Sequence, residues 1–313
     1  MADGPARAAI ATMPAARDRL NDALTEVREA VDARLPELLA ADAGGRDPLD
    51  PLPAAAREAL VSPGKRVRPA LVFLAGELFG AKRERLLDPA CAVEMIHAAS
   101  LALDDLPSMD NATTRRGRPA LHVAHGEDLA ILAAVTLLTR AFGLVADAGL
   151  KNGGPGASAA LDLISRLAES SGLSGLASGQ ALDLRTPESA ASFERLETIH
   201  ARKTGALFVA SAEFGAVLGG ARAKELAAVR SYAKNVGLAF QIVDDLLELT
   251  PNARTGKESL RAPAPTFARH VGREGARRLV AELTEHAVEA MGVFGKKGER
   301  LREFALVLRD RTR

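Results

Sequence analysis

The chain has 313 residues, of which 47% are hydrophobic and 26% are charged, a composition typical of an ordinary globular protein. Its 41 Lys and Arg residues nearly balance its 40 Asp and Glu residues, for a net charge of +1. This balance excludes a general electrostatic attraction to nucleic acid, so any function that depends on charge must come from local clusters.

The single cysteine, Cys91, lies in an apolar stretch, so an internal disulfide is excluded and a reducing compartment is expected. The N-terminal stretch MADGPARAAIATMPAARDRL has an early acidic residue and prolines where a signal peptide needs an unbroken apolar core. The apolar stretch at residues 129–150 is interrupted by Arg140 and Asp147, and falls short of the roughly 20 apolar residues of a spanning helix. We therefore expect a cytoplasmic protein without an integral membrane segment.

Apolar residues recur every three or four positions along most of the chain, first in LNDALTEVREAVDARLPELL at residues 20–39, and β-branched alternation is scarce. Breaks rich in Gly and Pro occur at residues 41–53, 151–156, 249–265 and 295–299. None of them resembles a flexible linker between domains. The pattern predicts an all-α fold with one domain over residues 1–313, a single large helical bundle in which residues 1–15 form a flexible N-terminal extension.

The first candidate site is PGKRVRP at residues 63–69, near the start of a predicted helix. Lys65, Arg66 and Arg68 gather positive charge where the backbone N–H groups and dipole of a helix N-terminus also favour an anion. A solvated basic helix start explains the same residues equally well, so both interpretations stay open here.

Two aspartates, Asp104 and Asp105, end the apolar helix predicted at residues 91–103. Pro107 removes a helical hydrogen bond, so the backbone should bend there and carry Asp110 back toward them. Three carboxylates that face one cavity repel each other unless a cation neutralises them, and hard oxygen ligands without paired Cys or His indicate Mg²⁺.

Three arginines follow this acidic cluster closely: Arg115, Arg116 and Arg118. Because Mg²⁺ in proteins usually also takes phosphate oxygens, the guanidinium groups can hold the part of a phosphate that the metal leaves uncovered. Taken alone, a solvated helix end followed by a basic loop is the simpler interpretation.

A second acidic cluster favours a binding site over a solvated helix end. In GLAFQIVDDLLEL, residues 237–249, Asp244 and Glu248 are four residues apart on one helical face, with Asp245 beside them. The surrounding residues are apolar, so these carboxylates are costly without a counter-charge. Two acidic clusters on apolar helices can face each other across a bundle and hold a diphosphate through metal ions.

Three further polar residues need a reason for their positions. Lys203 and Thr204, in ARKTGALF, open a long apolar stretch. Lys257, in TGKES, lies on a loop just past the second acidic cluster, where an ordinary surface lysine is as good an interpretation. His97 lies two turns before Asp104 on an apolar helix, and alone it is more simply a buried core histidine.

Five stretches resemble, in order and spacing, the motifs of the trans-isoprenyl diphosphate synthases, or polyprenyl synthetases: GKRVRP, DDLPSMDNATTRRGRPALH, GLASGQALDL, ARKTGALF and GLAFQIVDDLLEL. The resemblance extends from about residue 20 to the C-terminus. It implies an all-α bundle around a deep central cavity, usually as a homodimer. It also implies head-to-tail prenyl transfer, in which isopentenyl diphosphate condenses with an allylic diphosphate held by three Mg²⁺ ions.

The resemblance also assigns roles to the matching residues. The metal ligands would be Asp104, Asp105, Asp110, Asp244, Asp245 and Glu248. The allylic diphosphate would be held by Arg115, Lys203 and Lys257, and the metal-free isopentenyl diphosphate by Lys65, Arg68, His97 and Arg116. The cavity wall would be completed by Gln180, Asp183, Thr204 and Gln241. The residues that matter most for ionisation of the allylic C–O bond would be Asp104, Asp105, Asp110, Arg115, Lys203 and Asp244.

Product length is expected to depend on the residues just before the first aspartate. In the family, a bulky aromatic residue five positions before it limits the product to C15. Here that position is Ala99, preceded by Ala98 and followed by Ser100, so the floor of the pocket is small. With the two-residue insertion in DDLPSMD, this resembles bacterial geranylgeranyl diphosphate synthases and implies a C20 product, with C15 farnesyl diphosphate as the alternative.

Some positions depart from the family pattern, and two rival functions follow from the same residues. Glu248 stands where Asp is common, Leu103 replaces a common His, and the loop around Lys257 is shorter. A class I terpene cyclase would also ionise a prenyl diphosphate, but cyclases guide cations with aromatic walls, and only 4% of these residues are aromatic. A noncatalytic partner subunit is the other rival, and the intact aspartates argue against it.

Overall fold

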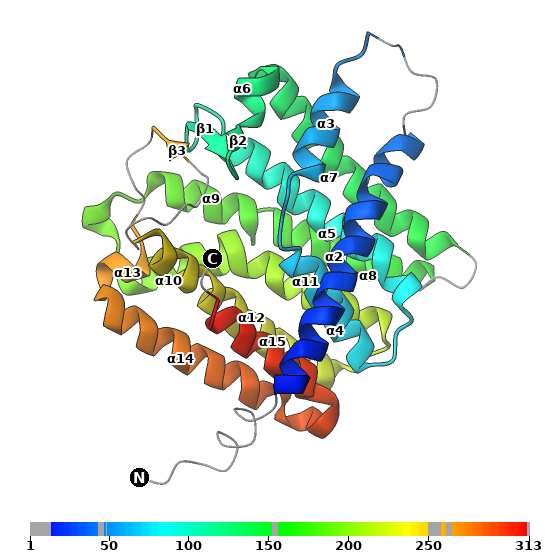
Figure 1. Cartoon of the computed structure of the whole chain (residues 1–313), viewed down its shortest axis with the longest axis vertical. Helices are drawn as coiled ribbons and strands as arrows, with labels where there is room; N and C mark the ends of the chain where they lie inside the picture. The colour runs from blue at the N-terminus through cyan, green and yellow to red at the C-terminus, as the bar shows by residue number, and fades with distance from the viewer. Residues whose placement is uncertain are drawn as a thin grey trace.

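A computed structural model describes residues 14–42, 47, 49–151, 156–249, 258–260 and 265–311 of the chain (Figure 1). The described residues form helices joined by short turns, with three short strands, which confirms the predicted all-α fold. The predicted N-terminal extension, residues 1–15, lies almost wholly outside the described residues.

The helices up to the first acidic loop are α2 (Pro14–Asp42), α3 (Leu52–Val61), α4 (Val67–Leu78) and α5 (Arg83–Asp104). After it come β1 (Ala112–Arg115), β2 (Arg118–Pro119), α6 (Leu121–His125), α7 (Glu127–Leu150), α8 (Ala157–Ser171), α9 (Leu176–Arg185) and η1 (Glu188–Ala190). The next elements are α10 (Phe193–His200), η2 (Ala201–Gly205), α11 (Ala206–Leu218) and α12 (Ala223–Glu248). The chain continues with β3 (Glu258–Ser259), α13 (Phe267–His270), α14 (Gly272–Ala290), η3 (Met291–Gly298) and α15 (Glu299–Arg309).

The predicted breaks coincide with element ends. Helix α2 ends at Asp42, α7 at Leu150 and α12 at Glu248, and Gly295, with φ 53°, interrupts the segment between α14 and α15. Gly and Pro act locally on the backbone, and this is why the sequence alone could place these ends.

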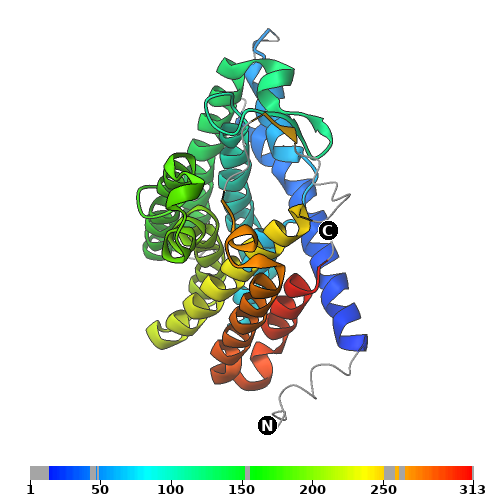
Figure 2. The ribbon, with the colours of Figure 1, turned by 90° about the vertical axis from the view of Figure 1, so that its left-hand side faces the viewer.

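Helix α11 lies at the centre of the bundle. Its sequence is apolar on nearly every side, which is typical of a helix buried all round, and it packs against α4, α5, α8 and α12. A Cβ atom on Gly215 would lie 2.1 Å from the carbonyl oxygen of Val72, so α11 and α4 are in backbone contact there. The two helices that carry the acidic clusters, α5 and α12, thus lie against the same central helix (Figures 1 and 2).

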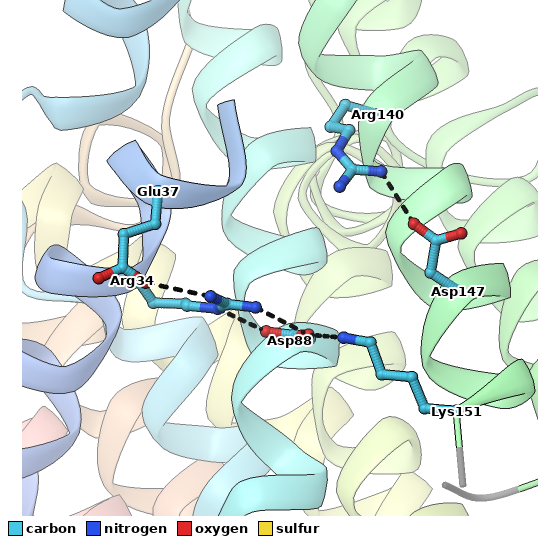
Figure 3. A network of polar contacts seen from close by, with 6 residues as sticks. All are labelled: Arg34, Glu37, Asp88, Arg140, Asp147 and Lys151. Carbon is cyan, nitrogen blue, oxygen red and sulfur yellow. Dashed lines mark hydrogen bonds and ion pairs between the residues drawn. The ribbon is translucent and has the colours of Figure 1, made fainter. Parts of the chain in front are cut away.

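A network of ion pairs fastens α2 to the central helices (Figure 3). Arg34 on α2 donates from Nε to Asp88 Oδ1 of α5 at 2.8 Å, and Lys151, just past α7, binds Asp88 Oδ2 at 2.7 Å. On α7, Arg140 pairs with Asp147 at 3.1 Å. A cavity of about 440 Å³ lies beside this network, and none of the predicted site residues lines it.

Two described helices, α5 and α7, have the length and apolar composition of a membrane-spanning segment. Most of α5 is buried in the core of the bundle, as a central helix of a folded domain would be. Helix α7 is less covered, and Ile131, Leu132 and Val135 on one face are 43–49% exposed. The absence of an integral membrane segment therefore stays a prediction.

Candidate active site

The first acidic loop begins where α5 ends, at Asp104. The turn that follows contains Pro107, and the backbone N–H of Asp110 donates to the carbonyl oxygen of Asp104 at 2.9 Å. The chain therefore returns on itself as the position of Pro107 predicts, and Asp110 lies beside Asp104.

Asp105, the next residue, forms an ion pair with Arg115. It is 2% exposed, and the Arg115 guanidinium binds both of its oxygens, with Nε 3.1 Å from Oδ1 and 2.9 Å from Oδ2 and with Nη2 also on Oδ1. This fork-to-carboxylate geometry is strong and directional, so Asp105 fixes the orientation of Arg115. A role of Asp105 as a metal ligand stays a prediction.

A small antiparallel sheet in the order β2-β1-β3 joins the first acidic loop to the segment after α12. Leu260 N–H donates to the carbonyl oxygen of Asn111 at 3.0 Å, and the hydroxyl of Ser259 donates to the carbonyl oxygen of Asp110. The end of this segment is therefore held against the loop that carries Asp110. Lys257, the residue before β3, lies outside the described residues.

Lys203 lies in a π-helical turn, η2, inserted between α10 and α11. Such turns are rare in proteins, and those that occur are often at functional sites. A Cβ atom on Gly179 would lie 2.2 Å from the backbone nitrogen of Lys203, so only glycine lets α9 approach this turn so closely. That approach places Asp183 of α9 against Lys203, with Oδ2 2.6 Å from Nζ.

The charges of the first acidic loop reach the same lysine. Burial lowers the pKa of Lys203, but the carboxylates of Asp104, Asp183 and Asp110 outweigh it and raise that pKa above its usual value. Arg115 also faces Asp104 and Asp110 besides its own partner. Two of the three cations predicted to hold the allylic diphosphate, Arg115 and Lys203, thus lie around Asp104 and Asp110.

The second acidic wall is at the end of α12. Burial raises the pKa of Asp244, and the positive charges of Arg311, Lys65 and Arg68 oppose that rise. Asp244 therefore lies near Lys65 and Arg68, two of the four residues predicted to bind isopentenyl diphosphate.

Sequence reasoning missed Arg311. Its guanidinium lies 2.8 Å from Asp244 Oδ1, donates to the carbonyl oxygen of Phe240 at 2.6 Å and stacks 3.7 Å from the centre of the Phe240 ring. Nothing in the surrounding sequence, RDRTR, distinguishes it from a solvated basic end, because the contact arises only when α15 brings the chain back to α12.

Asp245 lies on another side of α12, and burial raises its pKa to about 7. Gln241 donates from Nε2 to Asp245 Oδ1 at 3.1 Å and accepts at Oε1 from the hydroxyl of Thr204 at 2.7 Å. This chain of hydrogen bonds connects α12 to the π-helical turn. Glu248, one turn after Asp244, adds negative charge near Asp245.

The predicted isopentenyl diphosphate site carries excess positive charge. Burial lowers the pKa of Arg68 to about 10, and its Nε has no hydrogen-bond partner among the described residues. Burial lowers the pKa of His97 well below its usual value, as do the nearby charges of Arg68 and Arg116, so the imidazole is neutral near pH 7. Arg116, at φ 53°, donates from Nη1 to the carbonyl oxygen of Ser62 at 3.2 Å. A bound diphosphate would satisfy these cations.

Gln180 of α9 is 5% exposed, and neither its amide nitrogen nor its amide oxygen has a partner among the described residues. Buried polar groups are normally hydrogen-bonded, so an orphaned amide in this part of the bundle suits a ligand contact. At the predicted floor, Ala99 is fully buried and Ser100 donates its hydroxyl to the carbonyl oxygen of His97 at 2.8 Å. Both floor residues are therefore small, and the polar group of Ser100 is satisfied within α5.

Within the part of the chain that the structure describes, no three His, Cys, Asp or Glu side chains converge as a ready-made metal site. Mg²⁺ is usually held by one or two carboxylates together with substrate phosphates and water, not by a cage made only of protein. The hard oxygens of Asp104, Asp110 and Asp244, set among cations that suit phosphate, fit Mg²⁺ that arrives with a diphosphate.

Solved structures share this architecture. An FPP/GFPP synthase from Zymomonas mobilis matches with a TM-score of 0.79 and 33% identity, over 92% of this chain and 98% of that one. A geranyltransferase from Legionella pneumophila matches with a TM-score of 0.81 and 31% identity, over 95% and 99%. The chain therefore has the all-α isoprenoid synthase fold.

Sequence comparisons agree. The polyprenyl synthetase family model matches residues 50–261. A chloroplastic geranylgeranyl pyrophosphate synthase of Capsicum annuum is 40% identical over 248 residues, which is 78% of this chain and 66% of that protein. A chloroplastic geranylfarnesyl diphosphate synthase of Leucosceptrum canum is 39% identical over 275 residues, 86% and 72% respectively. The chain belongs to the polyprenyl synthetase family, and the expected reaction class, short-chain trans-prenyl transfer, is confirmed.

Proposed function

We propose that this chain condenses isopentenyl diphosphate with an allylic diphosphate in the presence of Mg²⁺ and releases geranylgeranyl diphosphate. The observation that carries this proposal is the separation of charge into two walls. Asp104 and Asp110 lie with Arg115 and Lys203, whereas Asp244 faces Lys65 and Arg68. Two diphosphates fit this arrangement: one held through Mg²⁺ between the aspartates of the two walls, and one held without metal by Lys65 and Arg68.

The aspartates and the cations have different tasks in the reaction. Asp104 and Asp110, with Asp244 opposite, would hold Mg²⁺ on the allylic diphosphate, and what the metal supplies when bound is electrostatic stabilisation of the departing pyrophosphate. Arg115 and Lys203 would bind the oxygens of that diphosphate as negative charge develops on them.

The carbon chemistry needs orientation and exclusion of water. Ionisation breaks the allylic C–O bond, and the double bond of isopentenyl diphosphate forms the new C–C bond. A proton is then lost, and released pyrophosphate is the acceptor we propose, because the motifs hold no obvious side-chain base. The apolar walls of α5, α11 and α12 would protect the cation from water.

A C20 product is supported by the small residues at the floor, Ala99 and Ser100, and by relatives named geranylgeranyl pyrophosphate synthases at about 40% identity. Farnesyl diphosphate is the alternative, since a solved relative is named an FPP/GFPP synthase.

The proposal includes a homodimer. The partly exposed apolar face of α7, with Ile131, Leu132 and Val135, supports it because a second copy of the chain could cover that face. We also propose a cytoplasmic location, supported by the single buried cysteine, Cys91, since a reducing compartment suits an unpaired thiol. The chloroplastic location in the relatives' names belongs to those plant proteins.

The test uses the purified chain alone with isopentenyl diphosphate and, separately, dimethylallyl, geranyl and farnesyl diphosphates, with Mg²⁺ or with EDTA. A linear, longer prenyl diphosphate formed only with Mg²⁺ is the expected result. A cyclic hydrocarbon would indicate a terpene cyclase. Activity that appears only after a second protein is added would indicate a noncatalytic subunit.

A further inference from the structure

Arg66 lies between Lys65 and Arg68, yet its side chain points into the protein. The side chain is 3% exposed, and Nη1 lies 2.7 Å from Oε1 of Glu94, whose side chain is 4% exposed. Its Nε lies 2.6 Å from Asp32 Oδ1 on α2. These bonds occupy the guanidinium, so Arg66 does not itself face a substrate.

The same guanidinium also holds the end of α3. Its Nη2 donates to the carbonyl oxygens of Ser62 at 3.2 Å and Leu60 at 3.5 Å. Arg116, one of the cations proposed to bind isopentenyl diphosphate, donates to the same Ser62 oxygen at 3.2 Å. The carbonyl group of Ser62 is therefore a point that the two arginines share.

The backbone of Arg66 is unusual. It has φ 49° and ψ 39°, the left-handed region that residues other than glycine seldom adopt, and it directly precedes α4. Such a conformation persists only where the surroundings over-determine it. Here the bonds from α2, α3 and α5 do so, and the resulting turn sets the directions of Lys65 on one side and Arg68 on the other.

The ion pair between Arg66 and Glu94, the anchor of this turn, also links the two diphosphate sites. Glu94 is on α5, three residues before His97 and ten residues before Asp104. Because a helix is stiff over this length, about 15 Å, the Arg66–Glu94 pair fixes the basic turn relative to the first acidic loop.

We propose that Arg66 is a positioning residue for isopentenyl diphosphate: through Glu94 it holds the left-handed turn that directs Lys65 and Arg68 at the metal-free diphosphate. The proposal rests on the proposed function. It predicts that loss of Arg66 weakens binding of isopentenyl diphosphate and leaves the allylic site nearly unchanged.

The test compares Arg66→Lys and Arg66→Gly with a matched control, Arg166→Lys. Arg166 also pairs with a buried glutamate, Nη1 lying 2.6 Å from Glu213 Oε2, but it joins α8 to α11. Glycine adopts the left-handed turn freely and lacks the anchor, so Arg66→Gly separates the role of the side chain from that of the backbone.

The readouts are the Kd of isopentenyl diphosphate alone by calorimetry, the KM of each substrate, and the thermal midpoint. Both Arg66 variants should raise the Kd and KM for isopentenyl diphosphate about tenfold and change the allylic KM less than about twofold. Arg166→Lys should leave the affinity for both substrates unchanged even if it lowers the thermal midpoint.

The inference would be overturned if the Kd of isopentenyl diphosphate were unchanged in both Arg66 variants. It would also be overturned if Arg166→Lys raised that Kd as much as the Arg66 variants do. If neither Arg66 variant folds, Asp32→Ala decides, because the Asp32 side chain is 45% exposed and its loss removes one bond to Arg66 while the pair with Glu94 remains. A rise in Kd of about threefold supports the inference, and no rise overturns it. Wild-type protein that transfers no prenyl group would instead contradict the proposed function.

Discussion

The guanidinium of Arg311 lies 2.8 Å from the carboxylate of Asp244, the aspartate through which α12 would take part in metal binding. In this arrangement the arginine supplies the positive charge that a metal ion would otherwise bring to that carboxylate. The two cations therefore compete for Asp244, and the pair must open or be shared when Mg²⁺ binds.

Arg311→Gln removes the competitor. We expect the Mg²⁺ concentration for half-maximal activity to fall about fivefold, since a partly exposed ion pair contributes about 1 kcal/mol. The measurement is a Mg²⁺ titration of initial rates. Arg309→Gln is the control, because the side chain of Arg309 is 37% exposed and pairs with that of its neighbour Asp310 at 2.7 Å. A Mg²⁺ requirement that stays the same in Arg311→Gln would contradict competition.

The aspartates of the first acidic loop should not be equivalent. Asp104→Ala, which removes a proposed metal ligand, should lower kcat about a thousandfold or more with the fold intact. Asp105→Asn disrupts a buried ion pair with Arg115, so besides lowering kcat it should lower the free energy of unfolding by about 3 kcal/mol. Rate assays and denaturant unfolding of both variants test this. A loss of activity below tenfold in Asp104→Ala would count against the metal assignment.

Local patterns explain what the sequence alone predicted. Apolar periodicity and the Gly and Pro breaks depend on neighbouring residues, so they predicted the helices and the return of Asp110 after Pro107. The contacts of Arg311 with Asp244 and of Arg66 with Glu94 join segments far apart in the chain. No local pattern encodes such contacts, and the π-helical turn at Lys203 is likewise invisible in a period of 3.6.

The proposed floor of the tail pocket can be raised. Ala99→Tyr should shorten the main product from C20 to C15, because the larger side chain occupies the path of the growing tail. Leu161→Tyr is the control: Leu161 is 67% exposed on α8, so its product should remain C20. Product length is resolved by chromatography after dephosphorylation. Unchanged C20 output from a folded Ala99→Tyr variant would mean that another residue forms the floor.

The uncovered face of α7 should hold the dimer together. Leu132→Glu combined with Val135→Glu places two charges on that face, and we expect the mass from light scattering to fall from dimer to monomer. Val293→Glu is the control, since Val293 is 74% exposed on η3. A double variant that keeps the dimer mass would exclude this face as the interface.

His200 should make stability depend on pH. Burial lowers its pKa to about 4, Asp183 opposes the shift and Lys203 adds to it. Because the unfolded state binds the proton first, near pH 6.5, folded stability should fall by about 2 kcal/mol between about pH 7 and pH 5, and the loss should level off below pH 4. His200→Phe should remove this part of the slope, whereas His270→Gln, at an exposed position, should keep it. Denaturant unfolding at several pH values measures both, and equal slopes in wild type and His200→Phe would contradict the assignment.

The most direct test of the central claim is the chain length of the product that the purified protein makes from farnesyl diphosphate and isopentenyl diphosphate with Mg²⁺. The account predicts a linear C20 diphosphate from one condensation, because the small residues at Ala99 and Ser100 leave room for one more isoprene unit. Farnesyl diphosphate left unextended, by an enzyme that does convert geranyl diphosphate to C15, would contradict the C20 assignment.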